Sequence, residues 1–152
     1  MISIHEKDSQ ILGECRTGVI IEDNADKLTS TISALKHGRC FITNGPQFLI
    51  KAIADVNHEM GDCLVANSIK IKIEFLSTEE IGNRGTIKVY SGIINEHDEQ
   101  LISEINISKN LFTEHIEISI NKCMYVRAEF EGNSYRGKRI ALTNPIWINP
   151  TK

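Results

Sequence analysis

The stretch Ser68-Ile-Lys-Ile-Lys-Ile-Glu-Phe-Leu76 alternates between apolar and charged residues over most of its length. Successive side chains of a β-strand point to opposite faces, so the apolar residues at 69, 71, 73 and 75 would share one face. The charged residues at 70, 72 and 74 would share the other face. Strands covered on both faces lack such alternation, so this stretch predicts a half-buried antiparallel strand.

Similar segments recur on both sides of this strand, separated by short stretches with Asn, Gly, Asp or Lys, as expected of turns. In one of them Ile87, Val89 and Ser91 would share a face. Strands are expected at residues 40–43, 47–56, 68–76, 86–94, 101–108, 114–120, 123–131 and 140–149. The pattern predicts an all-β fold: an antiparallel, immunoglobulin-like β-sandwich of about seven or eight strands. We expect Tyr125, Phe130 and Trp147 to pack in its core.

One N-terminal α-helix is predicted before these strands, over about residues 25–37. Asn24 is a suitable N-cap, and Asp26 would place a negative charge in the first turn. Gly38 would supply the left-handed cap at the other end. Three apolar residues recur at i, i+4 and i+7 and form a single stripe, namely Leu28, Ile32 and Leu35. We therefore divide the chain into a connecting segment with the helix, residues 1–38, and a sandwich domain, residues 39–152.

The composition of the 152 residues is that of one soluble globular domain, with 41% hydrophobic and 24% charged residues. The net charge of −3 and the absence of a basic face exclude a typical nucleic-acid-binding protein. No apolar run approaches the roughly 18 residues of a membrane-spanning helix, and the N-terminus does not resemble a secretory signal. A cytoplasmic protein is expected, whose widely spaced cysteines are reduced and mostly buried, at Cys15, Cys40, Cys63 and Cys123.

The sequence contains none of the common catalytic motifs: no Gly-x-Ser-x-Gly, no P-loop and no His-Glu-x-x-His. Its five histidines are dispersed without the spacing of a metal site, at His5, His37, His58, His97 and His115. The one basic cluster, Ser134-Tyr-Arg-Gly-Lys-Arg139, is expected in a hairpin. It is interpreted as a solvated turn, with contact to a phosphate or an acidic partner as the alternative.

Several stretches, read in order, resemble one family. They are Leu12–Val19 (LGECRTGV), Ala34–Pro46 (ALKHGRCFITNGP), Met60-Gly61-Asp62 and Ala141–Ile148 (ALTNPIWI). Together they are similar to the C-terminal, non-catalytic region of bacterial PHP-domain (polymerase and histidinol phosphatase type) metal-dependent phosphoesterases. In that family an AL-x-x-GR-x-F-x-TNGP element leaves the catalytic barrel, and a β-sandwich that closes on TNPI follows.

The resemblance implies that the catalytic barrel belongs elsewhere. PHP catalysis uses His and Asp/Glu ligands at the strand ends of a barrel to hold two or three metal ions. The last barrel motif of the family reads Ser-Asp-x-His, whereas Ser3-Ile4-His5 here lacks the Asp. His5 could be the remnant of a metal ligand, but one histidine is an incomplete site. The chain itself is then no enzyme and carries no cofactor, and divalent metals are expected only in the missing barrel.

The resemblance thus implies an accessory domain that supports or shapes a PHP barrel, its expected partner, with residues 1–38 as the joint. An uncovered helix face could also form a homodimer. The alternative is a free-standing β-sandwich binding module for carbohydrate or peptide, since sandwiches host many functions. A groove lined with exposed aromatic residues would favour that module. A third, less favoured class is an independent metalloenzyme that uses the dispersed histidines.

Overall fold

A computed structural model describes residues 15–21 and 26–151 of the chain. Over these residues it confirms an all-β sandwich-like fold with one helix, and it contains more strands than the sequence predicted. The helix is α1 (Lys27–Lys36). The strands are β1 (Arg16–Val19), β2 (Cys40–Thr43), β3 (Gln47–Ile53), β4 (Asn57–Glu59), β5 (Cys63–Val65), β6 (Ser68–Leu76), β7 (Arg84–Ile93), β8 (Glu99–Ser108), β9 (Leu111–Ser119), β10 (Met124–Ser134), β11 (Gly137–Thr143) and β12 (Ile146–Asn149).

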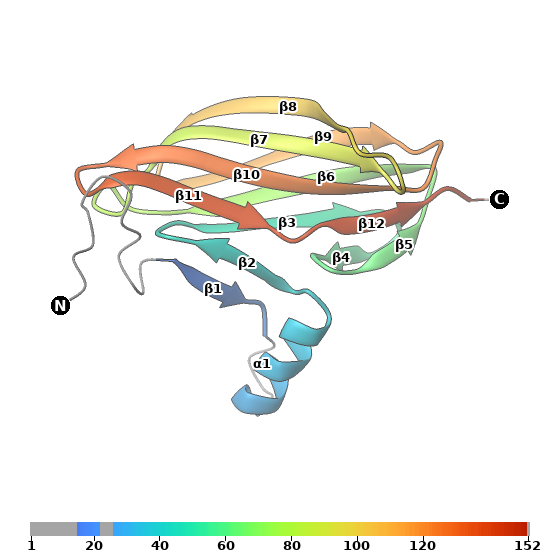
Figure 1. Ribbon diagram of the computed structural model, residues 1–152, viewed down its shortest axis with the longest axis horizontal. Helices are drawn as coiled ribbons and strands as arrows, with labels where there is room; N and C mark the ends of the chain where they lie inside the picture. Colours follow the sequence, from blue (N-terminus) through green and yellow to red (C-terminus); the bar gives the residue numbers. More distant parts are fainter. Residues whose placement is uncertain (1–14, 22–25, 152) are drawn as a thin grey trace.

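The strands form two sheets that pack face to face (Figure 1). The larger sheet runs β1–β2–β11–β10–β7–β8, and the smaller runs β4–β3–β6–β9. Strand β10 is long enough to pair with β7 on one side and with both β11 and β12 on the other. The pairs are antiparallel except for β12 with β5, which is parallel. Strand β6 has the predicted bounds, and its apolar positions face inward.

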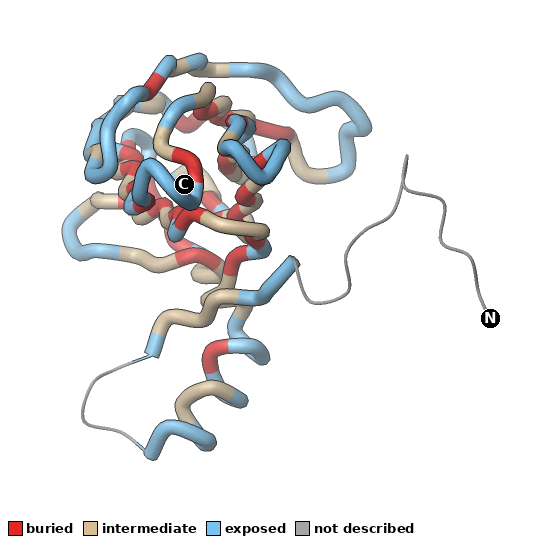
Figure 2. The backbone as a smooth tube through the Cα atoms, turned by 90° about the vertical axis from the view of Figure 1, so that its left-hand side faces the viewer, coloured by how far each residue is buried: buried red, intermediate tan, exposed pale blue. Residues whose placement is uncertain are grey.

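The core lies between the sheets, where buried residues concentrate (Figure 2). The inward-facing residues of β6, namely Ile69, Ile71, Ile73 and Phe75, are at most 3% exposed, and Ile87 and Val89 of β7 are fully buried. The ring of Phe75 in the smaller sheet lies 4.7 Å from the ring of Phe130 in the larger one. This contact joins the two layers within the core.

Several segments differ from the sequence prediction. The expected strand at 140–149 is broken at Asn144-Pro145 into β11 and β12, because proline cannot donate a ladder hydrogen bond. The stretch 57–62, expected as a turn, contains β4, and residues 63–65 form β5 beside β12. Residues 16–19, expected within a connecting segment, form β1, which pairs with β2.

Two of the three aromatic residues expected in the core lie outside it. Phe130 is 1% exposed, but Trp147 is 38% exposed, with its ring 5.3 Å from that of Tyr125. The alternation of β12 explains this, because it turns Ile146 and Ile148 inward and Trp147 outward. The expectation of mostly buried cysteines is also wrong. Among the described residues all four thiols are free, and three are exposed, namely Cys15, Cys63 and Cys123.

On the outer face of the larger sheet, a carboxylate and a guanidinium connect β8 to β10. The Arg127 Nε–H donates to Glu99 Oε1 at 2.7 Å, and the Tyr125 hydroxyl donates to the same oxygen at 2.8 Å. Arg127 also pairs with Glu129 and lies 4.9 Å above the ring of Tyr90. Hydrogen bonding from Arg127, and then from Tyr125, lowers the pKa of Glu99. The network therefore holds the edge strand β8 against its sheet.

Glu99→Gln is expected to show how this network depends on pH. The pKa of Glu99 is lower in the folded chain than in the unfolded chain, so its ionised carboxylate contributes fully to stability above the unfolded pKa near 4.5. This stabilisation is lost as the pH falls through the folded pKa. At pH 7 the substitution should cost no more than about 1 kcal/mol, since the pair is partly exposed. In urea unfolding the difference in stability between wild type and variant should shrink as the pH falls below the unfolded value near 4.5. The exposed Glu104→Gln on β8 is the control and should change little at either pH.

Candidate functional site

Helix α1 projects from the sandwich at the end of the β1–β2 extension (Figure 1). It begins at Lys27, two residues later than predicted, because the Asp26 carboxylate is its N-cap and accepts from the Thr29 N–H at 2.9 Å. Hydrogen bonding from Thr29 lowers the pKa of Asp26. The N-cap expected at Asn24 lies outside the described residues. The predicted cap at Gly38 is confirmed, with φ +71° and the Arg39 N–H donating to Ala34 O at 2.8 Å.

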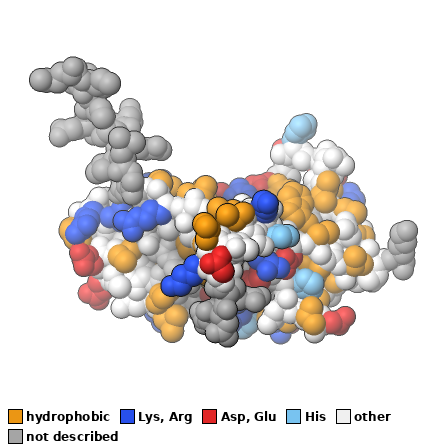
Figure 3. Space-filling view, turned by 90° about the horizontal axis from the view of Figure 1, so that it is seen from below, with side chains coloured by type: hydrophobic (Ala, Val, Ile, Leu, Met, Phe, Trp, Pro, Cys, Tyr) orange, Lys and Arg blue, Asp and Glu red, His pale blue; other side chains and the backbone are white. Residues whose placement is uncertain are grey.

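The helix presents small residues to the protein and large apolar residues to the surface. It contacts β1 of the sandwich, and its buried residue is Ala34. The predicted apolar stripe is exposed by 69%, 47% and 49% at Leu28, Ile32 and Leu35. Figure 3, seen from the side on which the helix projects, shows hydrophobic side chains at the surface beside Lys and Arg. The stripe is thus an outward face of the molecule.

The base of the helix is fixed by a contact that we call the helix junction, formed by Gly38, Gly61, Asn144 and Pro145. The Asn144 side-chain amide donates to Gly38 O at 2.9 Å, and the Gly61 N–H donates to Pro145 O at 2.8 Å. Gly61 has φ +84°, and a Cβ there would lie 1.8 Å from His37 O. Only glycine allows the β4–β5 turn to approach the helix end so closely.

An ion pair reinforces the helix junction. Arg39 Nη2 donates to Asp62 Oδ1 at 3.2 Å, and the other Asp62 oxygen accepts from the Glu59 N–H at 2.9 Å. Asp62 also accepts through its backbone oxygen from the Trp147 N–H at 2.9 Å. Three of the sequence stretches that carry the family resemblance therefore meet at one place: GR of 34–46, GD of 60–62 and NP of 141–148. A single sequence gives no signal that residues about 20 and 100 positions apart converge here.

The Thr43-Asn-Gly-Pro46 turn has a structural role of the same kind. The Asn44 side chain accepts from the Ile140 N–H at 2.8 Å and donates to Lys138 O at 3.0 Å. Thr43 Oγ1 donates to Pro46 O at 2.7 Å and accepts from the Gly45 N–H. Together with the backbone bond from the Asn44 N–H to Ile140 O at 3.2 Å, these bonds fix the turn at the end of β2 against β11.

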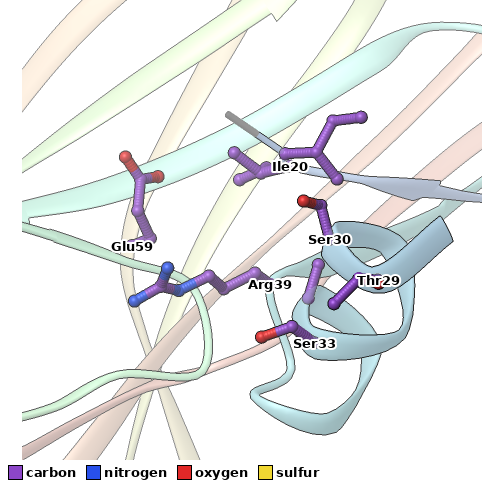
Figure 4. A pocket seen from close by; sticks show the side chains of 8 residues that line it. Ile20, Thr29, Ser30, Ser33, Arg39 and Glu59 are labelled. Carbon is purple, nitrogen blue, oxygen red and sulfur yellow. The ribbon is translucent and has the colours of Figure 1, made fainter. Parts of the chain in front are cut away.

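A cavity of about 370 Å³ lies beside the helix junction. Its apolar and hydroxyl lining comes from Ile20, Ile21, Ala34, Thr29, Ser30 and Ser33. Two charged residues, Arg39 and Glu59, complete it, and the end of the Arg39 side chain and Glu59 lie across from the hydroxyl groups of α1 (Figure 4). Each has a partner elsewhere, since Arg39 pairs with Asp62 and Glu59 Oε1 with Lys51 at 3.3 Å.

Hydrogen bonding at this cavity is incomplete. Arg39 Nε and Glu59 Oε2 are both buried without a hydrogen-bond partner. Such groups are few in native proteins, and each costs about 1–3 kcal/mol. Nearby, burial would lower the pKa of Lys51, but the carboxylates of Glu59 and Glu74 outweigh it and raise this pKa. The cavity therefore carries one cationic and one anionic residue, and the unpartnered atom of each is covered by protein.

The charged side chains of the basic hairpin, residues 134–139, bind to neighbouring residues. Arg136 pairs with Glu80 at 3.1 Å, and Lys138 pairs with Glu131 at 2.8 Å. Arg139, which is 5% exposed, donates from Nε to Ile81 O and Ser134 Oγ, at 2.9 and 3.0 Å. These contacts favour the interpretation of the cluster as a structural turn over a phosphate contact.

The four histidines that the structure describes do not come together in a metal-binding group. His5 lies outside the described residues. His37 ends α1, with Nδ1 2.8 Å from Ser33 O, while His58 is half-buried on β4 and His97 and His115 are exposed on separate elements. In residues 15–21 and 26–151, no group of three or more His, Cys, Asp or Glu could hold a metal ion. No helix within the described part of the chain is long and apolar enough to cross a membrane.

Comparisons with protein-family models, with curated proteins and with solved structures find no match for this chain. Its function is therefore inferred from the exposed helix stripe, the helix junction and the cavity.

Proposed function

We propose that this chain is a non-catalytic accessory domain of a PHP-type metal-dependent phosphoesterase, and that it packs against the catalytic barrel through α1. The observation that carries this proposal is the exposed stripe of Leu28, Ile32 and Leu35 on a helix that the sandwich contacts through small residues. Exposed apolar surface of this kind is typical of a protein–protein contact.

The short length of the helix is a second argument that a partner covers it. A ten-residue helix is marginal in water by itself, because nucleation is costly and packing supplies most helix stability. Of the ten residues of α1, only Ala34 is buried. A partner that covers the stripe would bury three large side chains, each contributing about 1.5–3 kcal/mol when fully buried.

The helix junction favours a rigid structural support for the barrel over a flexible tether. The hydrogen bond from Asn144 to Gly38 O and the ion pair of Arg39 with Asp62 hold the end of α1 against two sequence-distant segments. A barrel seated on the stripe would therefore be placed at a defined position against the sandwich. In this proposal the barrel supplies the metal ions and the hydrolytic chemistry, and the sandwich supplies stability and shapes access to the barrel.

Expressing this chain together with a PHP barrel encoded upstream of it in the same genome tests the proposal. We expect one-to-one co-elution in size-exclusion chromatography with light scattering, and metal-dependent phosphoesterase activity that belongs to the barrel. Ile32→Glu should weaken the association about 100-fold, because it places a charge in an apolar contact.

Val56→Glu is the matched control, since Val56 is 63% exposed and lies in the β3–β4 turn and not on α1. It should leave the association unchanged. An upstream reading frame without a barrel, a barrel that does not bind, or equal effects of the two variants would contradict the proposal. Self-association through the stripe would instead give a homodimer that Ile32→Glu dissociates.

The exposed aromatic residues give little support to the rival function, a free-standing module for carbohydrate or peptide. The cavity beside the helix junction is lined by no Trp or Tyr. Tyr125 and Trp147 contact each other, and the Tyr125 hydroxyl is used by Glu99. Their contacts are explained by cross-strand packing on the outer face of the sheet.

A further inference from the structure

Strand β9 is an open edge of the smaller sheet. It pairs with β6 over nine residues without interruption, and within the described residues no strand pairs with its other side. Of the other edge strands, β1, β4 and β5 have three or four residues, and the pairing of β8 with β7 is interrupted by a bulge at Val89 and Tyr90. Short strands and bulges protect an edge from pairing with another chain. Protection of the long, regular β9 must come from its side chains.

The hydrogen bonds at the two ends of β9 show which of its backbone groups face the open edge. Just after the strand, the Ile120 N–H donates to Asn67 O at 2.8 Å. Just before it, Asn110 O accepts from the Ser77 N–H at 2.8 Å, so the even-numbered residues bond toward β6. In an antiparallel ladder the alternate residues turn their N–H and C=O groups away from that neighbour. The odd-numbered residues, with His115 at the centre, therefore present these groups at the edge.

Glu114 is a charged residue at an inward-facing position of this edge. It lies opposite the fully buried Ile73 of β6, and directly opposite residues share one face of a sheet. Because β9 is the edge, Glu114 is nevertheless exposed, and its carboxylate accepts from the His115 N–H at 3.0 Å. Inward-pointing charges are one means by which natural sheets protect their edge strands. Here the carboxylate also occupies the central N–H that the edge would offer to a new strand.

We infer that Glu114 prevents a second copy of this chain from pairing its own β9 with this edge. Two β9 strands paired antiparallel about His115 would place Phe112 opposite Ile118. They would also place Glu114 opposite Ile116. The three apolar residues are half-buried against the core, so a second strand would cover them further and favour pairing. The same pairing would bury the carboxylate of Glu114 and displace it from the His115 N–H, which opposes pairing. This inference goes beyond the accessory role and does not depend on a barrel.

Glu114→Ile tests the inference by size-exclusion chromatography with light scattering. The substitution frees the His115 N–H and makes the facing inward positions apolar, so the variant should dimerise at least about 100-fold more tightly than the wild type. Amide hydrogen exchange locates the contact, because the amides of residues 113, 115 and 117 should be protected in the dimer and exchange rapidly in the wild type. Circular dichroism shows whether the variant is folded. If it is not, Glu114→Thr, which removes the charge but adds less apolar surface, should give the same dimer more weakly.

Glu117→Ile is the matched control on the same strand. Glu117 is exposed on the outer face and pairs with Lys70 at 3.5 Å, so the substitution adds the same side chain without freeing the edge. It should stay monomeric at the concentration at which Glu114→Ile dimerises. A folded, monomeric Glu114→Ile, or equal association of the two variants, would overturn the inference. Dissociation of the dimer by Ile32→Glu would place the contact at the helix stripe and overturn it as well.

Discussion

Phe75→Ala is expected to lower the free energy of unfolding by about 3–5 kcal/mol, the usual cost of removing a buried phenylalanine from a core. Phe75 is 1% exposed and contacts Phe48 within its own sheet and Phe130 in the facing sheet. Its removal would leave a cavity at the point where the two layers meet. Urea denaturation followed by tryptophan fluorescence and circular dichroism measures the loss.

The neighbouring Leu76→Ala is the matched control on the same strand. Leu76 is 49% exposed, so its truncation should cost less than about 1 kcal/mol. A one-residue shift of register would exchange the faces of the two side chains. Equal costs, or a larger cost at Leu76, would therefore contradict the described sandwich.

Gly61→Ala is expected to cost about 2–4 kcal/mol and to displace α1. An alanine at φ +84° is itself strained, and its Cβ would lie 1.8 Å from His37 O. The β4–β5 turn must then move away from the helix end, with loss of the hydrogen bond from the Gly61 N–H to Pro145 O. Urea denaturation gives the cost, and NMR shifts of residues 34–40 report the displacement.

Gly137→Ala is the control that separates backbone strain at a positive φ from close contact with neighbouring atoms. Gly137 has φ +110°, but a Cβ there would meet no atom within 4 Å. The backbone penalty should then remain at about 1–2 kcal/mol, without any change in the signals of α1. If both variants behave alike, the close approach at Gly61 is not what positions the helix.

The long strands could be predicted from the sequence because their alternation is regular. In β6 four apolar residues fall at every second position, and burial of that face requires no information from elsewhere in the chain. Strands β1, β4 and β5 have three or four residues, too few for a period of two to be distinguished from chance. Their pairing partners, β2, β3 and β12, decide their structure.

The candidate site could be predicted only in part. The stripe of α1 follows from helical spacing, but its exposure follows from the three-dimensional position of the helix. The role of Gly38 as a helix cap could be predicted from the sequence, whereas the contact of Gly61 with the helix end depends on tertiary structure. The unused hydrogen-bonding groups of Arg39 and Glu59 have no sequence signal, because they are defined by the lack of a neighbour in space.

Solvent exposure of the helix stripe is the most direct test of the central claim that α1 presents its apolar residues outward from a fixed base. Methyl NMR in the presence of a water-soluble paramagnetic probe measures this in the unmodified chain. Strong relaxation enhancement is predicted at the methyl groups of Leu28, Ile32 and Leu35, and weak enhancement at Ile71 and Ile73, which are fully buried. Equal protection of the stripe and the core in the monomer would contradict the account.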